Sequence, residues 1–211
     1  MISSNYFFLS FFYNLLDPNN NNCFNKKLVN KNARLVIDGF PGSGQSFLLK
    51  YTLNNTNVCY NNVIHHTHSS IVSINAALMG IPVVILLRPP DEAVYSLISR
   101  WKHVPFEYAY DYYCKFYESL LDSNIKFYIL DTKDLFKNKL SPYLSYLSDQ
   151  NIHINQNLKY DSLFPEKLKS NEWKDRKSKF KIFHRKVLAY NLPQISNSRK
   201  LYSKIYEVRS H

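Results

Sequence analysis

Three of the four glycines in the chain, Gly39, Gly42 and Gly44, fall in one short segment, and this segment constrains the fold more than any other feature. The apolar run Leu35–Asp38 precedes it and the largely apolar segment Phe47–Leu53 follows it. The run is typical of a buried strand and the segment of a helix. Unhindered backbone between a strand and a helix presents N–H groups to an anion, and the helix dipole adds attraction. The sequence therefore predicts a phosphate-binding loop.

Short apolar runs alternate with helical patterns after this loop. Further strands are expected at 63–66, 82–87 and 126–130, and helices at 70–79, 91–101, 108–122, 135–147, 185–192 and 196–208. This order predicts an α/β fold with a parallel sheet flanked by helices. Three parts of the chain are distinguished: an N-terminal helix and Asn-rich linker (1–33), a nucleotide-binding core (34–150), and a basic, mainly helical extension of the same domain (151–211).

The net charge of +11 favours anionic partners, such as nucleotides or sulfated and phosphorylated substrates. Residues 166–186 carry nine basic against three acidic residues, which makes this segment the most basic part of the chain. The high Tyr and Phe content is interpreted as compositional bias. No clear sign of nucleic-acid binding is present.

The aromatic run 5–16 is too short to span a bilayer, which takes about 20 residues, and is expected to be an amphipathic helix on the core. A membrane-surface anchor is the alternative. The three cysteines, Cys23, Cys59 and Cys114, are too far apart for a disulfide framework or a zinc motif. A cytoplasmic location is therefore expected.

Arg88 directly follows the strand expected at 82–87, and Ser96 comes eight residues later. The carboxyl end of a strand is where open α/β sheets bind ligands. The planar guanidinium fork suits a phosphate group. Arg88 and Ser96 are therefore candidate phosphate ligands.

A cluster of three histidines, His65, His66 and His68, follows the second expected strand. Histidine can accept a proton near neutral pH, which suits a general base. On an extended segment alternate residues share a face, so His66 and His68 are expected to point the same way. A structural role, or a zinc site built from all three, remains open at this stage.

The segments that carry these features resemble the sulfotransferase family, whose donor is 3′-phosphoadenosine 5′-phosphosulfate (PAPS). Phe40-Pro41-Gly42-Ser43-Gly44-Gln45-Ser46 resembles the family's loop, except that Gly42 stands where the family usually has Lys or Arg. The strand followed by Arg88 and Ser96 resembles the family's 3′-phosphate site. The run from His65 to Ser69 resembles bacterial members. The glycine spacing also fits an ATP or GTP P-loop, apart from Gln45 at the lysine place.

The resemblance implies a three-layer, P-loop NTPase-like and sulfotransferase-like fold. It implies transfer of a sulfuryl group from PAPS to a hydroxyl or amine acceptor, with a carbohydrate as one candidate, and it requires no metal. The loop residues would hold the 5′-phosphosulfate, and Arg88 and Ser96 the 3′-phosphate. His68 would be the base, because the family's catalytic histidine has a Thr-His context. Replacing Gly42 by Arg or Lys would then restore the missing cation.

Two other functions remain open. The first is a catalytically weak or inactive sulfotransferase-fold module that binds an anionic partner through the segment 166–186. The second is a P-loop kinase, which the neutral Gln45 disfavours.

Overall fold

A computed structural model of the chain describes residues 32–156, 171–190 and 192–209. Its strands are β1 (Leu35–Gly39), β2 (Val63–His65), β3 (Val83–Leu87) and β4 (Tyr128–Asp131). Its helices are α3 (Gln45–Asn55), the 3₁₀-helix η1 (Tyr60–Asn62), α4 (Ser70–Leu78), α5 (Pro90–Arg100), α6 (Phe106–Asp122), α7 (Thr132–Phe136), α8 (Ser141–Asp149), α9 (Asn171–Ala189) and α10 (Pro193–Val208).

The four described strands form one sheet in the order β2-β1-β3-β4, and every pairing is parallel. This confirms the α/β class and the parallel sheet expected from the sequence. The chain passes from β1 outward to β2 and then crosses to β3 on the other side of β1. Open α/β sheets bind ligands outside the carboxyl ends of the strands at such a reversal. The loop after β1 and Arg88 after β3 both begin there.

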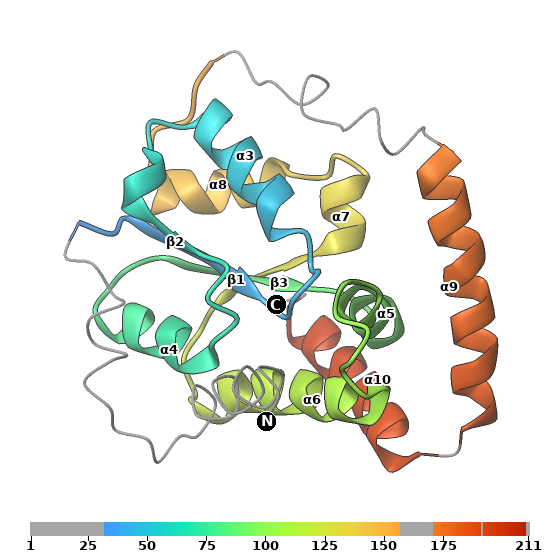
Figure 1. Cartoon of the computed structure of the whole chain (residues 1–211). Helices are drawn as coiled ribbons and strands as arrows, with labels where there is room; N and C mark the ends of the chain where they lie inside the picture. The colour runs from blue at the N-terminus through green and yellow to red at the C-terminus, as the bar shows by residue number, and fades with distance from the viewer. Residues whose placement is uncertain (1–31, 157–170, 191, 210–211) are drawn as a thin grey trace, which may run out of the picture.

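Helices cover both faces of the sheet (Figure 1). Helices α3, α7 and α8 pack on one face around Leu48, Leu135 and Leu147. Helices α4, α5, α6 and α10 pack on the other face. All five residues of β1 and of β3 are buried, as expected of central parallel strands. The arrangement is compatible with a three-layer α/β fold.

The C-terminal helices differ from the expectation in their bounds. Helix α9 begins at Asn171, well before residue 185, because no Gly or Pro interrupts the chain as far as Ala189. Its Phe180 and Phe183 rings lie 5.4 and 5.3 Å from the Tyr95 ring of α5. Helix α9 therefore lies on the outer side of α5, as Figure 1 shows.

The segment expected at 135–147 forms two short helices, α7 and α8, and Pro142 lies in the first turn of α8. The expected helix 5–16, Cys23 and residues 166–170 of the basic segment lie outside the described residues. None of the helices in the described part of the chain is both long and apolar enough to cross a membrane.

Candidate functional site

The backbone of the loop between β1 and α3 is shaped to hold an anion. Gly42 and Gly44 have φ angles of 87° and 89°, in the left-handed region that glycine enters without steric cost. Within the described residues, no acceptor takes the backbone N–H groups of Gly44, Gln45 or Ser46. These groups stand at the positive end of the α3 dipole. The loop can therefore donate several hydrogen bonds to a phosphate or sulfate.

Several side chains of the loop are buried, and one of them packs in the core. Phe40, Pro41 and Ser43 are buried, and the Phe40 ring packs 5.1 Å from Tyr112 and 5.3 Å from Tyr113. The backbone N–H of Ser43 donates to the Phe40 carbonyl at 3.1 Å. Phe40 and the Ser43 backbone thus help to fix the shape of the loop, and the backbone N–H groups at the start of α3 are open to an anion.

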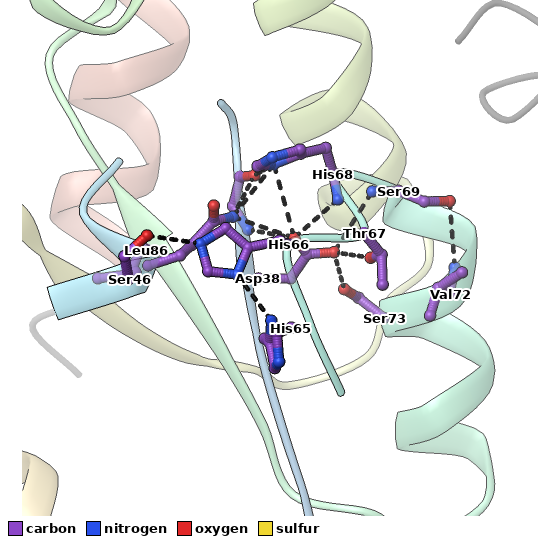
Figure 2. A network of polar contacts seen from close by, with 12 residues as sticks. Asp38, Ser46, His65, His66, Thr67, His68, Ser69, Val72, Ser73 and Leu86 are labelled. Atoms are coloured by element: carbon purple, nitrogen blue, oxygen red, sulfur yellow. Dashed lines mark hydrogen bonds and ion pairs between the residues drawn. The ribbon is translucent and has the colours of Figure 1, made fainter. Parts of the chain in front are cut away.

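The buried carboxylate of Asp38, near the end of β1, is the centre of the polar network in Figure 2. Its oxygens accept from the backbone N–H groups of Gly39 (2.9 Å), His68 (2.9 Å) and Ser69 (3.3 Å), from the Gln45 amide (3.1 Å), and from the hydroxyls of Thr67 and Ser73 (3.4 Å). Burial raises the pKa of Asp38, and the adjacent His68 and these hydrogen bonds oppose the rise. Asp38 therefore joins the loop between β1 and α3 (residues 40–44, called the phosphate loop after its predicted role) to the segment between β2 and α4.

Gln45 belongs to this network and not to the anion space. Its Nε2 donates to the Gly39 carbonyl at 2.7 Å and to Asp38 Oδ1 at 3.1 Å, and the residue is 3% exposed. A P-loop lysine at this place would normally reach the phosphates. Here a neutral amide satisfies two buried acceptors, which accounts for a glutamine at this position.

The histidine run is not extended. The prediction that His66 and His68 share a face assumed an extended segment, and that assumption is wrong. Strand β2 ends at His65, and His66 and His68 have φ angles of 56° and 52°. Left-handed backbone turns the chain back toward the phosphate loop. His66 Nε2 lies 2.8 Å from Ser46 Oγ, and His68 Nδ1 lies 2.9 Å from the Gly39 carbonyl oxygen. Both imidazoles therefore border the loop, with ring centroids 6.1 Å apart.

The surroundings of the histidines set their protonation. His68 Nδ1 lies 2.9 Å from the Gly39 carbonyl, which can only accept, and 3.3 Å from Gln45 Nε2, whose two hydrogens already go to Gly39 and Asp38. These contacts favour the neutral tautomer with the proton on Nδ1, in which Nε2 is an acceptor. Burial, together with the nearby His65, His68 and Arg100, lowers the pKa of His66 to about 4. Burial also lowers the pKa of His65, against the opposing charge of Asp38. His66 is thus neutral at pH 7.

Arg88 and Ser96 meet the phosphate loop at Gly42. Arg88 Nη1 donates to the Gly42 carbonyl at 2.6 Å, while Nε and Nη2 each donate to Glu92 at 3.2 Å. Ser96 is 4% exposed, and its Oγ lies 2.6 Å from the place that a Cβ on Gly42 would occupy. The residues predicted from two distant segments are therefore brought together at the carboxyl ends of β1 and β3.

No protein-family model, curated protein or solved structure matches this chain. Among the described residues, no three His, Cys, Asp or Glu side chains are placed to hold a metal ion.

Tyrosines of α6 support the site and were not predicted as functional. The hydroxyls of Tyr112, Tyr113 and Tyr117 donate, each at 2.7 Å, to the carbonyls of His68, Arg88 and Leu86. Tyr113 and Tyr117 are four residues apart and so lie on one helix face. This spacing is visible in the sequence, but attributing the tyrosines to compositional bias overlooks it. They fix the backbone after β3, while Tyr112 fixes the histidine segment.

Arg100 is a second residue that the sequence did not single out. Its Nη2 lies 2.9 Å from the Cβ position of Gly42, and its Nε donates to the Ser96 carbonyl at 3.1 Å. Arg100 follows Ser96 by four residues, which places both on one face of α5. The site thus combines backbone donors, an arginine beside the loop and an imidazole acceptor at His68.

Proposed function

We propose that this chain is a PAPS-dependent sulfotransferase. The observation that carries the proposal is the meeting of Arg88, Ser96 and the phosphate loop at Gly42. A donor with phosphate at 3′ and phosphosulfate at 5′ needs two anion sites a short distance apart. The loop backbone supplies the first, and Arg88 with Ser96 would supply the second. Binding would require the Arg88 fork to exchange its Glu92 partner for the phosphate, at least in part.

In the proposed reaction, an acceptor hydroxyl or amine attacks the sulfur of PAPS in line with the bond to the bridging phosphate oxygen. The new sulfur–acceptor bond forms as the sulfur–bridging oxygen bond breaks. The acceptor's proton passes to a base, and 3′-phosphoadenosine 5′-phosphate (PAP) leaves. His68 is the proposed base, because its Nε2 carries the lone pair when Nδ1–H donates to Gly39.

A second candidate is a sulfotransferase-fold module without turnover that binds an anionic partner. Two observations favour it. Gly42 lacks the cation usual at that place, and Arg88 is already paired with Glu92. Exposed cations of α9, among them Lys181 and Arg185, offer such a module a basic surface.

One binding experiment separates these functions. Calorimetric titration with PAP, 5′-AMP and Mg²⁺-ATP compares the three anion patterns on the same protein. A sulfotransferase site predicts PAP at least about tenfold tighter than 5′-AMP, roughly 1.4 kcal/mol. Equal affinities, or a preference for Mg²⁺-ATP, would contradict the proposal. PAP binding without sulfate transfer to any of a panel of hydroxyl and amine acceptors would favour the inactive module.

A further inference from the structure

We infer that Arg100 supplies the cation that the phosphate loop lacks at Gly42, and that it does so for the anion at the 5′ end of the donor. The inference rests on the proposed function for the identity of the donor. The presence of an anion site beside Arg100 does not depend on that function.

The Arg100 guanidinium lies beside the phosphate loop at Gly42. The Arg100 Nη2 atom lies 2.9 Å from the Cβ position of Gly42, so the guanidinium occupies the space that a longer side chain at residue 42 would enter. A lysine or arginine at residue 42 would therefore compete with Arg100, in its present position, for the same space. The glycine is what allows the guanidinium to approach the loop backbone.

Two contacts within α5 and at its end orient the Arg100 side chain. Arg100 Nε donates to the Ser96 carbonyl at 3.1 Å, and the guanidinium lies 5.5 Å from the centre of the Trp101 ring. A cation over an aromatic face is attracted by the negative face of the ring. These two contacts hold an otherwise flexible side chain against the loop, which lowers the entropy lost when an anion binds.

The charge of Arg100 acts on His66, at the start of α3. Its charge is among the causes that lower the pKa of His66, and His66 Nε2 lies 2.8 Å from Ser46 Oγ at the start of α3. The charge of Arg100 is therefore felt at the same end of α3 as the backbone N–H groups of the loop. This favours a role toward the 5′ group, where charge develops on the bridging oxygen during transfer.

Arg88 does not fill this role. Its guanidinium donates to the Gly42 carbonyl and to Glu92, so the Glu92 carboxylate offsets part of its charge. Gln45 is neutral and turned toward Asp38. Arg100 is thus the cation that the geometry assigns to the loop.

The test uses the full chain and inorganic pyrophosphate, titrated by calorimetry in metal-free buffer at low ionic strength. Arg100→Gln should weaken pyrophosphate binding by about tenfold, and Arg100→Lys should recover part of the loss. Lys126→Gln is the matched control, because Lys126 is exposed and precedes β4, at the end of the parallel sheet opposite the loop. It should leave the affinity within about twofold.

The outcomes distinguish this inference from the proposed function. Failure of the wild-type chain to bind pyrophosphate, or equal binding by the wild type and Arg100→Gln, would overturn the inference. The ratio of PAP to 5′-AMP affinity should be the same in the wild type and Arg100→Gln, and a fall in this ratio would assign Arg100 to the 3′-phosphate instead. If pyrophosphate binding depends on Arg100 while wild-type PAP binds no tighter than 5′-AMP, the inference stands and the sulfotransferase proposal fails.

Discussion

Arg88 donates from Nη1 to the Gly42 carbonyl at 2.6 Å, and this bond ties the end of β3 to the phosphate loop. The loop, the arginine after β3 and the first turns of α5 therefore form one connected unit. In such a unit the shape of the loop depends on residues that never touch an anion.

Gly42→Ala should destabilise the protein more than Gly80→Ala. Both glycines have positive φ, 87° and 75°, so both changes share the cost of left-handed backbone. A Cβ at residue 42 would lie 2.6 Å from Ser96 Oγ, whereas nothing lies within 4 Å of one at Gly80. Overpacking of this kind costs about 1–3 kcal/mol. Urea unfolding of both variants measures the difference, and equal losses would contradict the packing described here.

The same clash argues against a gain in turnover from Gly42→Arg or Gly42→Lys, the changes that would restore the missing cation. Either side chain must displace Ser96 and Arg100 to fit, so a loss of stability is expected in place of a gain in rate. From the sequence alone, Gly42 is a departure from the family's pattern. In the structure it is the position where α5 meets the loop.

The strand–loop–helix unit was predictable because a buried apolar run, clustered glycines and a helical pattern each leave a local mark in the sequence. The spacing of Arg88 and Ser96 could also be detected along the chain. The direction of a side chain could not, because it depends on the partners that the fold brings near it. Gln45 turns inward to satisfy Asp38 and Gly39, and Arg100 reaches the loop only because α5 packs beside it.

Gln45→Lys restores the P-loop pattern in sequence and should not create an ATP site. The new ammonium would lie beside the buried Asp38 carboxylate, which is its nearest opposite charge. The affinity for Mg²⁺-ATP should therefore rise by less than about threefold, as measured by calorimetry. Gln45→Ala, which lacks both donor and charge, is the comparison. A tenfold gain specific to the lysine would show that this side chain can turn toward the phosphates.

Tyr113→Phe should lower the free energy of unfolding by about 1–3 kcal/mol, because it leaves the Arg88 carbonyl without its buried donor. Tyr113 is fully buried, whereas Tyr108 on the same helix is 53% exposed. Tyr108→Phe is therefore the control and should change stability by less than about 0.5 kcal/mol. Thermal or urea unfolding of both variants measures the difference in the free energy of unfolding. Similar small effects in both variants would mean that α6 does not hold this backbone in place.

His66 should make the protein less stable in mild acid. Its pKa is about 4 in the folded chain and about 6.5 when unfolded, so the unfolded state binds more protons between these values. This contribution to stability is fully present above pH 6.5 and is lost as the pH falls through 6.5 toward 4. His66→Asn, which tolerates left-handed backbone, should flatten the fall of unfolding free energy over that window. The exposed His153→Asn is the control, and an unchanged slope in His66→Asn would contradict the burial of this imidazole.

The assignment of the base depends on the difference between His68 and His66. A general base works best with a pKa near the working pH, and the pKa of about 4 makes His66 a poor proton acceptor at pH 7. His68 keeps its Nδ1 on the Gly39 carbonyl, so its Nε2 is the atom that can take the acceptor's proton.

His68→Ala should therefore reduce sulfate transfer by about 10²–10⁴-fold and leave PAP affinity within a few fold, because the removed imidazole acts on the acceptor. His66→Ala should reduce transfer less. His68→Asn tolerates the φ of 52° and separates loss of the base from loss of backbone shape, so it should be as slow as His68→Ala. Steady-state rates with a responsive acceptor and PAP titrations measure both quantities. A His68 variant that keeps near-normal turnover, or a larger loss at His66, would move the role of base to His66 despite its low pKa.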